Sequence, residues 1–232
     1  MTSVNYWVVI PAAGIGSRMQ SDTPKQYLQL AGKPVLQHTL ECFLQHPRIR
    51  AVVVVLAAED PYWPALSIAS HDRIMTATGG SERCHSVLNG LKTLAGVAAG
   101  NDWVLVHDAA RPCLTSADLD RLLDTVGDHA VGGILAAPVR DTMKRGGADH
   151  EIAATVDRRD LWHAMTPQMF RYEKLLKALS TALENREMVT DEAQAMEMTG
   201  VKPLLVEGHI SNIKITQMGD LDVAQFYLQR RE

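Results

Sequence analysis

Residues 7–19 read WVVIPAAGIGSRM, and residues 24–27 read PKQY. The apolar run at the start predicts a buried strand, which then breaks into small residues and glycines. Small side chains let a backbone approach a ligand closely, so that its N–H groups can point at phosphate oxygens. Arg18 and Lys25 add positive charge that the backbone lacks. The stretch predicts a loop that binds phosphate, with a simple tight turn as the alternative.

Two common phosphate-binding motifs do not fit this loop. Met19 stands where the third glycine of the dinucleotide pattern G-x-G-x-x-G would be, and no Gly-Lys-Ser/Thr closes a Walker P-loop. The missing glycine, together with the lack of an acidic residue in register at the end of the second strand, argues against an NAD-binding dehydrogenase.

Three further apolar runs alternate with amphipathic segments. The runs at 51–56, 103–106 and 134–139 are continuous, as is typical of parallel strands covered on both faces. Apolar residues at helical spacing, with Thr115 and Asp118 in a capping pattern, predict helices over 35–44, 115–126, 175–183 and 221–228. This order predicts an α/β fold with a Rossmann-like, doubly wound, mostly parallel sheet, forming one domain over 1–232.

The segment at about 140–162 interrupts the alternation. Two short β-prone runs, 142–145 and 152–156, flank the glycine-rich turn 146–149, which predicts a hairpin that projects from the core. A lone hairpin with open edges is marginal in water, which favours an arm stabilised by a second copy of the chain. A surface insertion is the alternative.

Composition excludes several classes of protein. The formal net charge of −4 argues against a nucleic-acid partner, and no apolar run approaches the length of a membrane helix. Cys42, Cys84 and Cys113 are scattered and form no C-x-x-C pair, which indicates a reducing compartment, here the cytoplasm, and argues against disulfides and zinc.

Polar residues follow the predicted strands at their carboxyl ends, where open parallel sheets bind ligands. Asp108, in the run HDAARP at 107–112, can hold Mg²⁺ on nucleotide phosphates. The alternative for Asp108 is a helix N-cap or an ion pair with Arg111. Residues 212–216 predict a short strand that carries Lys214.

The turn GGSER at 79–83 feeds a second predicted helix and suits contact with a base or ribose. The alternative, a helix start with Ser86 as its cap, is compatible with that role. His107 and His163 show no metal-ligand spacing, and we expect both to be structural.

These motifs, taken in order, closely resemble those of the 2-C-methyl-D-erythritol 4-phosphate cytidylyltransferases. The resemblance runs over residues 7–228 and rests on PAAGxGxRM with PKQY, GGxxRxxSV, VHDAARP, APVxDT, TxDR, LWxAxTPQ, TDEA and NIKIT. It implies a fold of the nucleotide-diphospho-sugar transferase type with a β-hairpin dimerisation arm. It also implies a Mg²⁺-dependent homodimer that joins CTP to methylerythritol phosphate and releases pyrophosphate, in the non-mevalonate route to isoprenoid precursors.

The resemblance also implies roles for individual residues. Arg18 and Lys25 would stabilise charge on the α-phosphate, Lys214 would position the attacking phosphate, and Asp108 would hold the metal near the substrate hydroxyls. Arg158, on the arm, would reach into the partner's site and bind the substrate phosphate. The CTP cradle would comprise Ala12, Ala13, Gly14, Gly16, Gly80, Ser81, Ser86 and Ala109, and the methylerythritol phosphate pocket would comprise Arg111, Thr142, Thr166 and Thr190.

Two alternative functions remain. A relative that acts on another pentitol phosphate, such as ribitol 5-phosphate, would share the chemistry at the strand ends. A non-catalytic nucleotide-binding protein on the same fold would be expected to lack Arg18, Lys25 or Asp108, and all three are present.

Overall fold

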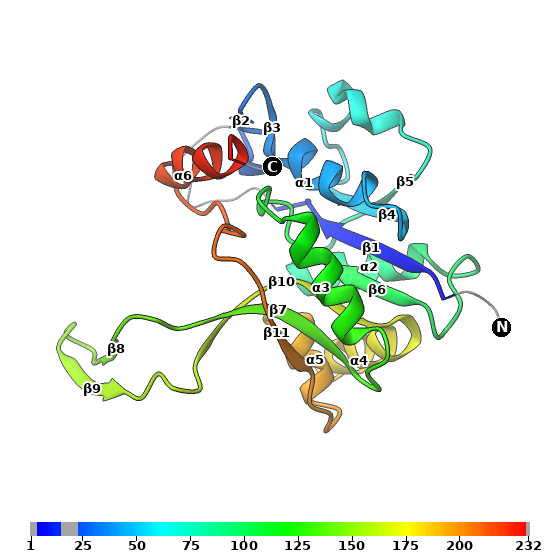
Figure 1. Ribbon diagram of the computed structural model, residues 1–232. Coiled ribbons are helices and arrows are strands. Elements are labelled where there is room, and N and C mark those ends of the chain that lie inside the picture. Colours follow the sequence, from blue (N-terminus) through cyan, green and yellow to red (C-terminus); the bar gives the residue numbers. More distant parts are fainter. Residues whose placement is uncertain (1–3, 15–22, 231–232) are drawn as a thin grey trace.

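The centre of the molecule is a seven-stranded sheet, seen in a computed structural model that describes residues 4–14 and 23–230 (Figure 1). All neighbouring strands are parallel except β10, which is antiparallel to both of its neighbours. Across the sheet the order is β11 (Leu204–Glu207), β7 (Gly132–Pro138), β10 (Trp162–Arg171), β6 (Trp103–Val106), β1 (Tyr6–Pro11), β4 (Ile49–Leu56) and β5 (Ile74–Thr78).

Helices cover both faces of the sheet. One face packs against α1 (Val35–Leu44) and α3 (Ser116–Val126), and the other packs against α2 (Arg83–Thr93), α4 (Tyr172–Glu184) and α5 (Glu192–Glu197). Successive strand residues point to opposite faces, so Val8 belongs to the first core and Val9 to the second. Continuous apolar strands are therefore required, and the predicted doubly wound α/β fold is confirmed.

The remaining elements are short or peripheral. A small antiparallel pair, β2 (Gln29–Leu30) and β3 (Lys33–Pro34), packs with α6 (Gly219–Leu228) beside the sheet (Figure 1). Single 3-10 turns are η2 (Lys25–Tyr27), η3 (Trp63–Ala65) and η4 (Ser67–Ser70). The predicted cap is confirmed, because the Thr115 side chain accepts a hydrogen bond from the Asp118 N–H at the start of α3. Across the described ranges, none of the helices combines the length and the apolar character that crossing a membrane would require.

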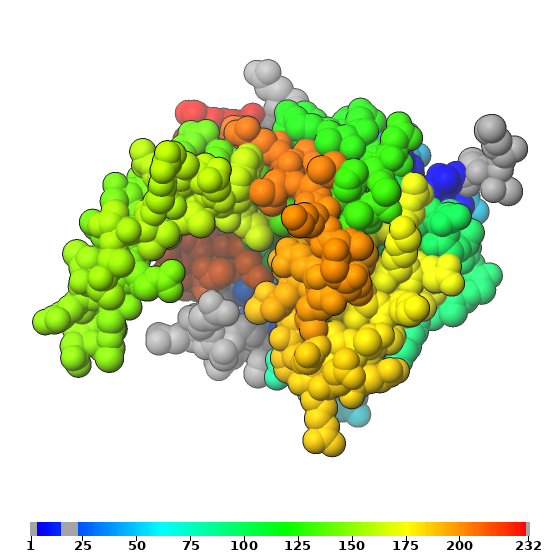
Figure 2. Space-filling model, turned by 90° about the horizontal axis from the view of Figure 1, so that it is seen from below, coloured from blue at the N-terminus to red at the C-terminus, as the bar shows by residue number. Residues whose placement is uncertain are grey.

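The predicted hairpin is present. β8 (Met143–Gly146) and β9 (Ile152–Val156) form their own two-stranded sheet, which stands clear of the body in Figures 1 and 2. Most of its residues are exposed, and Ile152 is 68% exposed. Its use as a dimerisation arm stays a prediction.

The prediction of a strand at 212–216 is wrong. This segment has no strand pairing and crosses the carboxyl ends of the central strands, where the Ile215 N–H donates to the Ala110 carbonyl at 2.9 Å. Side chains hold it instead, because Arg111 Nη1 donates to the Asn212 carbonyl (2.6 Å) and the Asn212 amide donates to the Thr166 carbonyl (2.7 Å).

A buried carboxylate fastens the start of β1 to the start of β6. Asp102 is 3% exposed and accepts hydrogen bonds from the Trp7 indole (2.9 Å) and from the N–H groups of Asn5 and Ala99 (both 3.0 Å). Burial raises the pKa of Asp102, but these hydrogen bonds outweigh it and hold that pKa below its usual value.

We expect Asp102→Asn to lower the free energy of unfolding by about 2 kcal/mol at pH 7, because either orientation of the amide leaves a buried donor facing NH₂. The Asp102 pKa is lower in the folded state, so its contribution is complete above the ordinary aspartate pKa and is lost as pH falls below it. Urea unfolding should therefore show a difference between wild type and variant that shrinks below about pH 4.

The matched control is Asp72→Asn, at a side chain that is 90% exposed. Equal stability of the two variants at pH 7 would show that the Asp102 hydrogen bonds contribute nothing.

Candidate active site

A cleft of about 430 Å³ opens at the carboxyl ends of the central strands. Loops that follow β1, β5 and β6 meet there, together with η2 and the segment 212–216. Its lining is Pro11, Ala12, Ala13, Gly14, Lys25, Gln26, Gly80, Ser81, Glu82, Arg83, Ser86, Asp108, Ala109, Ala110 and Lys214. Most of the residues singled out in the sequence are therefore brought together.

The two glycine-containing loops pack tightly against one another. A Cβ on Gly79 would lie 2.3 Å from the Ala13 Cβ, so only glycine fits this approach. The Gly80 N–H donates to the Ser86 hydroxyl at 3.0 Å, and this hydroxyl also donates to the Glu82 carbonyl. Glu82 is the N-cap of α2 and Ser86 lies inside the helix, so the alternative of Ser86 as the helix cap is wrong.

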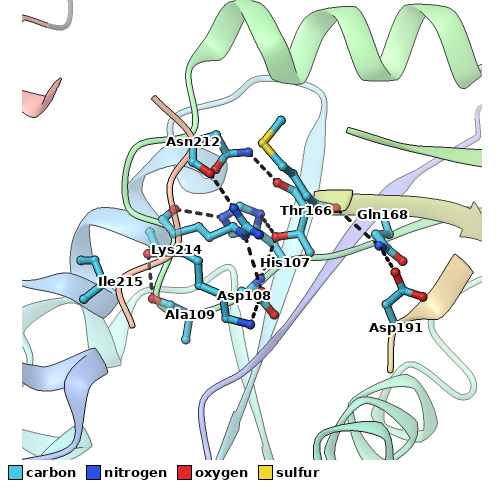
Figure 3. A network of polar contacts seen from close by, with 12 residues as sticks. His107, Asp108, Ala109, Thr166, Gln168, Asp191, Asn212, Lys214 and Ile215 are labelled. Carbon is cyan, nitrogen blue, oxygen red and sulfur yellow. Dashed lines mark hydrogen bonds and ion pairs between the residues drawn. The ribbon is translucent and has the colours of Figure 1, made fainter. Parts of the chain in front are cut away.

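Asp108 is the electrostatic centre of the cleft (Figure 3). Its side chain lies 2.8 Å from Lys214 Nζ, 3.1 Å from Arg83 Nε and 3.5 Å from Arg111 Nε. Burial raises the pKa of Asp108, but the charges of these cations outweigh burial and hold the pKa well below its usual range. Asp108 is therefore a carboxylate, and the ion pair with Arg111 is present without a helix cap.

A buried layer behind Asp108 fixes its backbone. Thr166 lies at an irregularity of β10, and its hydroxyl accepts the Asp108 N–H at 3.1 Å. The same hydroxyl lies 3.0 Å from His107 Nδ1, while His107 Nε2 lies 3.1 Å from the Arg111 carbonyl (Figure 3). Complete burial is the largest influence on the His107 pKa and lowers it to about 4. His107 is thus neutral near pH 7, which supports a structural role.

The two lysines of the cleft meet the same chain segment. Lys214 projects from it to Asp108, and Lys25 Nζ donates to the Ile215 carbonyl at 3.0 Å. Because Asn212 and Arg111 pin this segment, the positions of both ammonium groups are set by buried hydrogen bonds.

A buried ion pair was missed from the sequence. Glu192 is 1% exposed at the start of α5, and its two oxygens lie 2.7 and 3.1 Å from Arg83 Nη1 and Nη2. Burial lowers the pKa of Arg83, but the charges of Glu192 and Asp108 outweigh this and raise it. Gln168 holds α5 in place, because it donates to Asp191 (3.0 Å) and accepts the Ala193 N–H (2.8 Å). The sequence contained both residues within recognised motifs, Arg83 in GGxxR and Glu192 in TDEA.

Other predicted site residues lie outside this cleft. Thr166 and Arg111 stand behind Asp108, and the exposed Thr190 bonds to Gln194. Thr142 and Arg158 are exposed near the base of the hairpin. Gly16 and Arg18 fall outside the described residues. Within 4–14 and 23–230, no three His, Cys, Asp or Glu side chains gather in a way that could hold a metal ion.

Comparison with known proteins identifies relatives of this chain in both sequence and fold. Residues 6–230 match the family described as 2-C-methyl-D-erythritol 4-phosphate cytidylyltransferase. Enzymes of that name from Pseudomonas putida and Vibrio parahaemolyticus are 56% and 54% identical over 94% and 96% of this chain, and over 93% and 94% of their own lengths. The Francisella tularensis crystal structure of that name superposes with a TM-score of 0.84 at 38% identity, covering 96% of this chain and 99% of that one.

We expect Glu192→Ala to lower the free energy of unfolding by about 3 kcal/mol, because it leaves the largely buried Arg83 with one anionic partner instead of two. The Lys33–Glu41 pair, at 2.8 Å with side chains 45% and 23% exposed, supplies the control. Glu41→Ala should cost less than about 1 kcal/mol. Urea unfolding at pH 7 measures both, and equal costs would contradict a special contribution of the buried pair.

Proposed function

The chain belongs to the 2-C-methyl-D-erythritol 4-phosphate cytidylyltransferase family, and on this premise we propose which of its residues carry out the transfer. As a member it transfers the cytidylyl group of CTP to 2-C-methyl-D-erythritol 4-phosphate, a step of isoprenoid biosynthesis. The observation that carries the proposed site is the convergence of Lys25, Lys214 and Asp108 on a glycine-containing loop at the sheet edge.

The chemistry requires alignment of two anions. A phosphate oxygen of the methylerythritol substrate forms a bond to the α-phosphorus of CTP, and the bond from that phosphorus to the β-phosphate oxygen breaks, releasing pyrophosphate. The attacking oxygen is already deprotonated at neutral pH, so no general base is needed, in keeping with a neutral His107. In our proposal Lys25 and Arg18 stabilise the charge that develops at the α-phosphate, while Lys214 positions the attacking phosphate.

The CTP cradle is proposed to consist of the two packed loops. Ala12, Ala13 and Gly14 on one loop and Gly80, Ser81 and Ser86 on the other line the cleft, and Ala109 lines it as well. Backbone groups near Gly80 would read the cytosine edge. Gly16 belongs to the same proposal and lies outside the described residues.

Mg²⁺ dependence is part of the proposal, and the donor set fits it. Mg²⁺ in nucleotide sites is held by one or two carboxylates together with substrate phosphates and water, so a dedicated cluster of protein ligands is not required. Asp108 would hold the ion, which would neutralise charge on the triphosphate. The described cations around Asp108 keep it ionised and therefore able to serve as a ligand.

The second substrate is proposed to bind where two copies of the chain meet. Thr142 and Arg158 lie outside the cleft of their own chain, near an exposed hairpin whose edges need a partner. In a homodimer with exchanged arms, Arg158 would bind the substrate phosphate in the partner's site, beside Arg111, Thr166 and Thr190. A cytoplasmic location belongs to the same proposal, supported by three scattered cysteines without a C-x-x-C pair.

We expect Lys25→Ala and Arg18→Ala to keep the fold and to lose on the order of 10²–10³ in kcat, because each removes a preorganised cation from the developing charge. Pyrophosphate release with Mg²⁺, CTP and methylerythritol phosphate measures this loss, and circular dichroism checks the fold. Wild-type turnover by either variant would remove that residue from the site.

The same assay tests the proposed reading of the base and the choice of acceptor. ATP, GTP and UTP, and ribitol 5-phosphate in place of methylerythritol phosphate, should give little pyrophosphate. Equal use of all four nucleotides would refute cytosine recognition near Gly80.

Arm exchange predicts complementation between two inactive variants. We expect a mixed dimer of Arg158→Ala and Lys25→Ala chains to regain activity, because one of its two sites would combine an intact Lys25 with an intact Arg158. Differently tagged chains, co-expressed and purified through both tags, allow the measurement against each variant alone. Complete failure to complement would place Arg158 in its own chain's site or in neither.

A further inference from the structure

Gln26 makes an unusual pair of contacts with the first loop. It is 4% exposed and lies in η2 directly after Lys25. Its side-chain amide nitrogen donates to the Ala12 carbonyl at 2.7 Å and to the Gly14 carbonyl at 2.9 Å. Both N–H bonds of one buried carboxamide are therefore spent on alternate carbonyls of the loop that follows β1.

These contacts fix the direction of a neighbouring N–H group. The Ala12 carbonyl and the Ala13 N–H belong to one planar trans peptide and point in opposite directions. Since Gln26 holds the carbonyl, the Ala13 N–H points away from Gln26. In the described part of the chain this N–H donates to no protein acceptor, and Ala13 lines the cleft. It is therefore available to an anionic ligand.

The backbone of Gln26 is held as firmly as its side chain. Next to it, the Tyr27 hydroxyl donates to Asp60 at 2.7 Å, and the Tyr27 ring stacks on Tyr62 with centroids 4.9 Å apart. Lys25, on the other side, extends to the Ile215 carbonyl. Gln26 thus joins the loop that presents Ala13 to the anchored turn that presents Lys25.

We propose that Gln26 is a positioning residue for the nucleotide: it aims the Ala13 N–H at a phosphate oxygen and keeps the loop in register with the Lys25 ammonium. This inference rests on the proposed function, in which the cleft receives the triphosphate of CTP. In this role Gln26, which is 4% exposed, acts through the loop. Gln26 holds the peptide groups at residues 12–14 in one orientation before the ligand binds, so that binding does not have to order them.

The test is Gln26→Met, which is close in length and removes both hydrogen bonds. Calorimetry with CTP and Mg²⁺, without the second substrate, should show a Kd raised by about tenfold to a hundredfold, the range for losing a hydrogen bond to a charged group. The KM for methylerythritol phosphate should stay within about twofold of wild type, because its pocket does not involve this loop. If Gln26 had only a structural role, its loss would lower the Tm and would raise the CTP Kd and the KM for methylerythritol phosphate in parallel.

Tyr27→Phe is the matched control, since it removes only the hydrogen bond to Asp60 and keeps both the aromatic ring that stacks on Tyr62 and the Gln26 contacts with the loop. It should lower the Tm while the CTP Kd changes by less than about twofold. Gln26→Glu keeps the size of the side chain but turns acceptors toward two carbonyls, and it should weaken CTP binding as Gln26→Met does. If Gln26→Met does not fold, the CTP Kd of Gln26→Glu tests the positioning role instead.

The outcomes separate this inference from the proposed function. Failure of wild type to bind and turn over CTP would reject the proposed function. Normal wild-type binding with an unchanged CTP Kd in a folded Gln26 variant would reject only the positioning role. Loss of the fold in both Gln26 variants would also reject it, because Gln26 would then serve folding.

Discussion

Asp108 carries a negative charge in the interior at the end of β6, and three cations surround it. Arg111 follows three residues later in the same loop, whereas Arg83 and Lys214 come from distant parts of the chain. Without such partners, a buried carboxylate would lose several kcal/mol of hydration free energy, and no attraction to opposite charges would compensate this loss. The cluster is therefore possible only where the fold brings Arg83, Arg111 and Lys214 to one point. Conversely, the cluster ties the start of α2, the loop after β6 and the segment 212–216 to each other.

The charges of the cleft do not cancel, and this imbalance suits its ligand. Among the described groups, four cations, Arg83, Arg111, Lys214 and Lys25, stand against three carboxylates, Asp108, Glu192 and Glu82, so cations outnumber carboxylates. This local excess of positive charge is opposite in sign to the formal net charge of the molecule, which is −4. Walls of low polarizability, supplied by Ala12, Ala109 and Ala110, strengthen the field of these cations at close range. An anionic ligand that enters the cleft therefore meets an excess of positive charge at close range.

The central part of the fold could be predicted from the sequence because its signals are local. β1, β4 and β6 are buried on both faces, which forces uninterrupted apolar runs that can be recognised without knowledge of their neighbours. β10 mixes polar and apolar residues because it runs antiparallel, carries an irregularity at Thr166 and is exposed where it leaves the sheet. The edge strand β11 spans only four residues. Neither strand has a pattern that distinguishes it from a loop.

In the candidate site, too, some residues could be placed from the sequence and others could not. Loops at strand ends follow from topology, so Lys25 and Asp108 could be placed at one edge from the sequence. The run NIKIT at 212–216 alternates like a half-buried strand. The lateral edge of the sheet beside β7 is already occupied by β11. Polar contacts of Arg111 and Asn212 instead hold the segment across the carboxyl ends of the strands. Arg83 and Glu192 each belong to a recognised motif, but they lie 109 positions apart and no local pattern shows that the two side chains pair. Contacts of this range arise from tertiary packing alone.

The partners that Lys25 and Lys214 already have explain how the cleft can bind an anion with little rearrangement of its side chains. Lys214 rests on a carboxylate and Lys25 on a backbone carbonyl, so both ammonium groups are already partly removed from water and aimed into one cavity. A phosphate that enters exchanges one acceptor for another of higher charge, and little new desolvation or ordering of these side chains is required. The loop after β1 is likewise ordered before a ligand binds. Gln26 holds the Ala12 and Gly14 carbonyls, and the Ala13 N–H stays available to the ligand. Binding energy can then be directed to the transition state, since the ground-state arrangement of donors is set by the buried layer behind them.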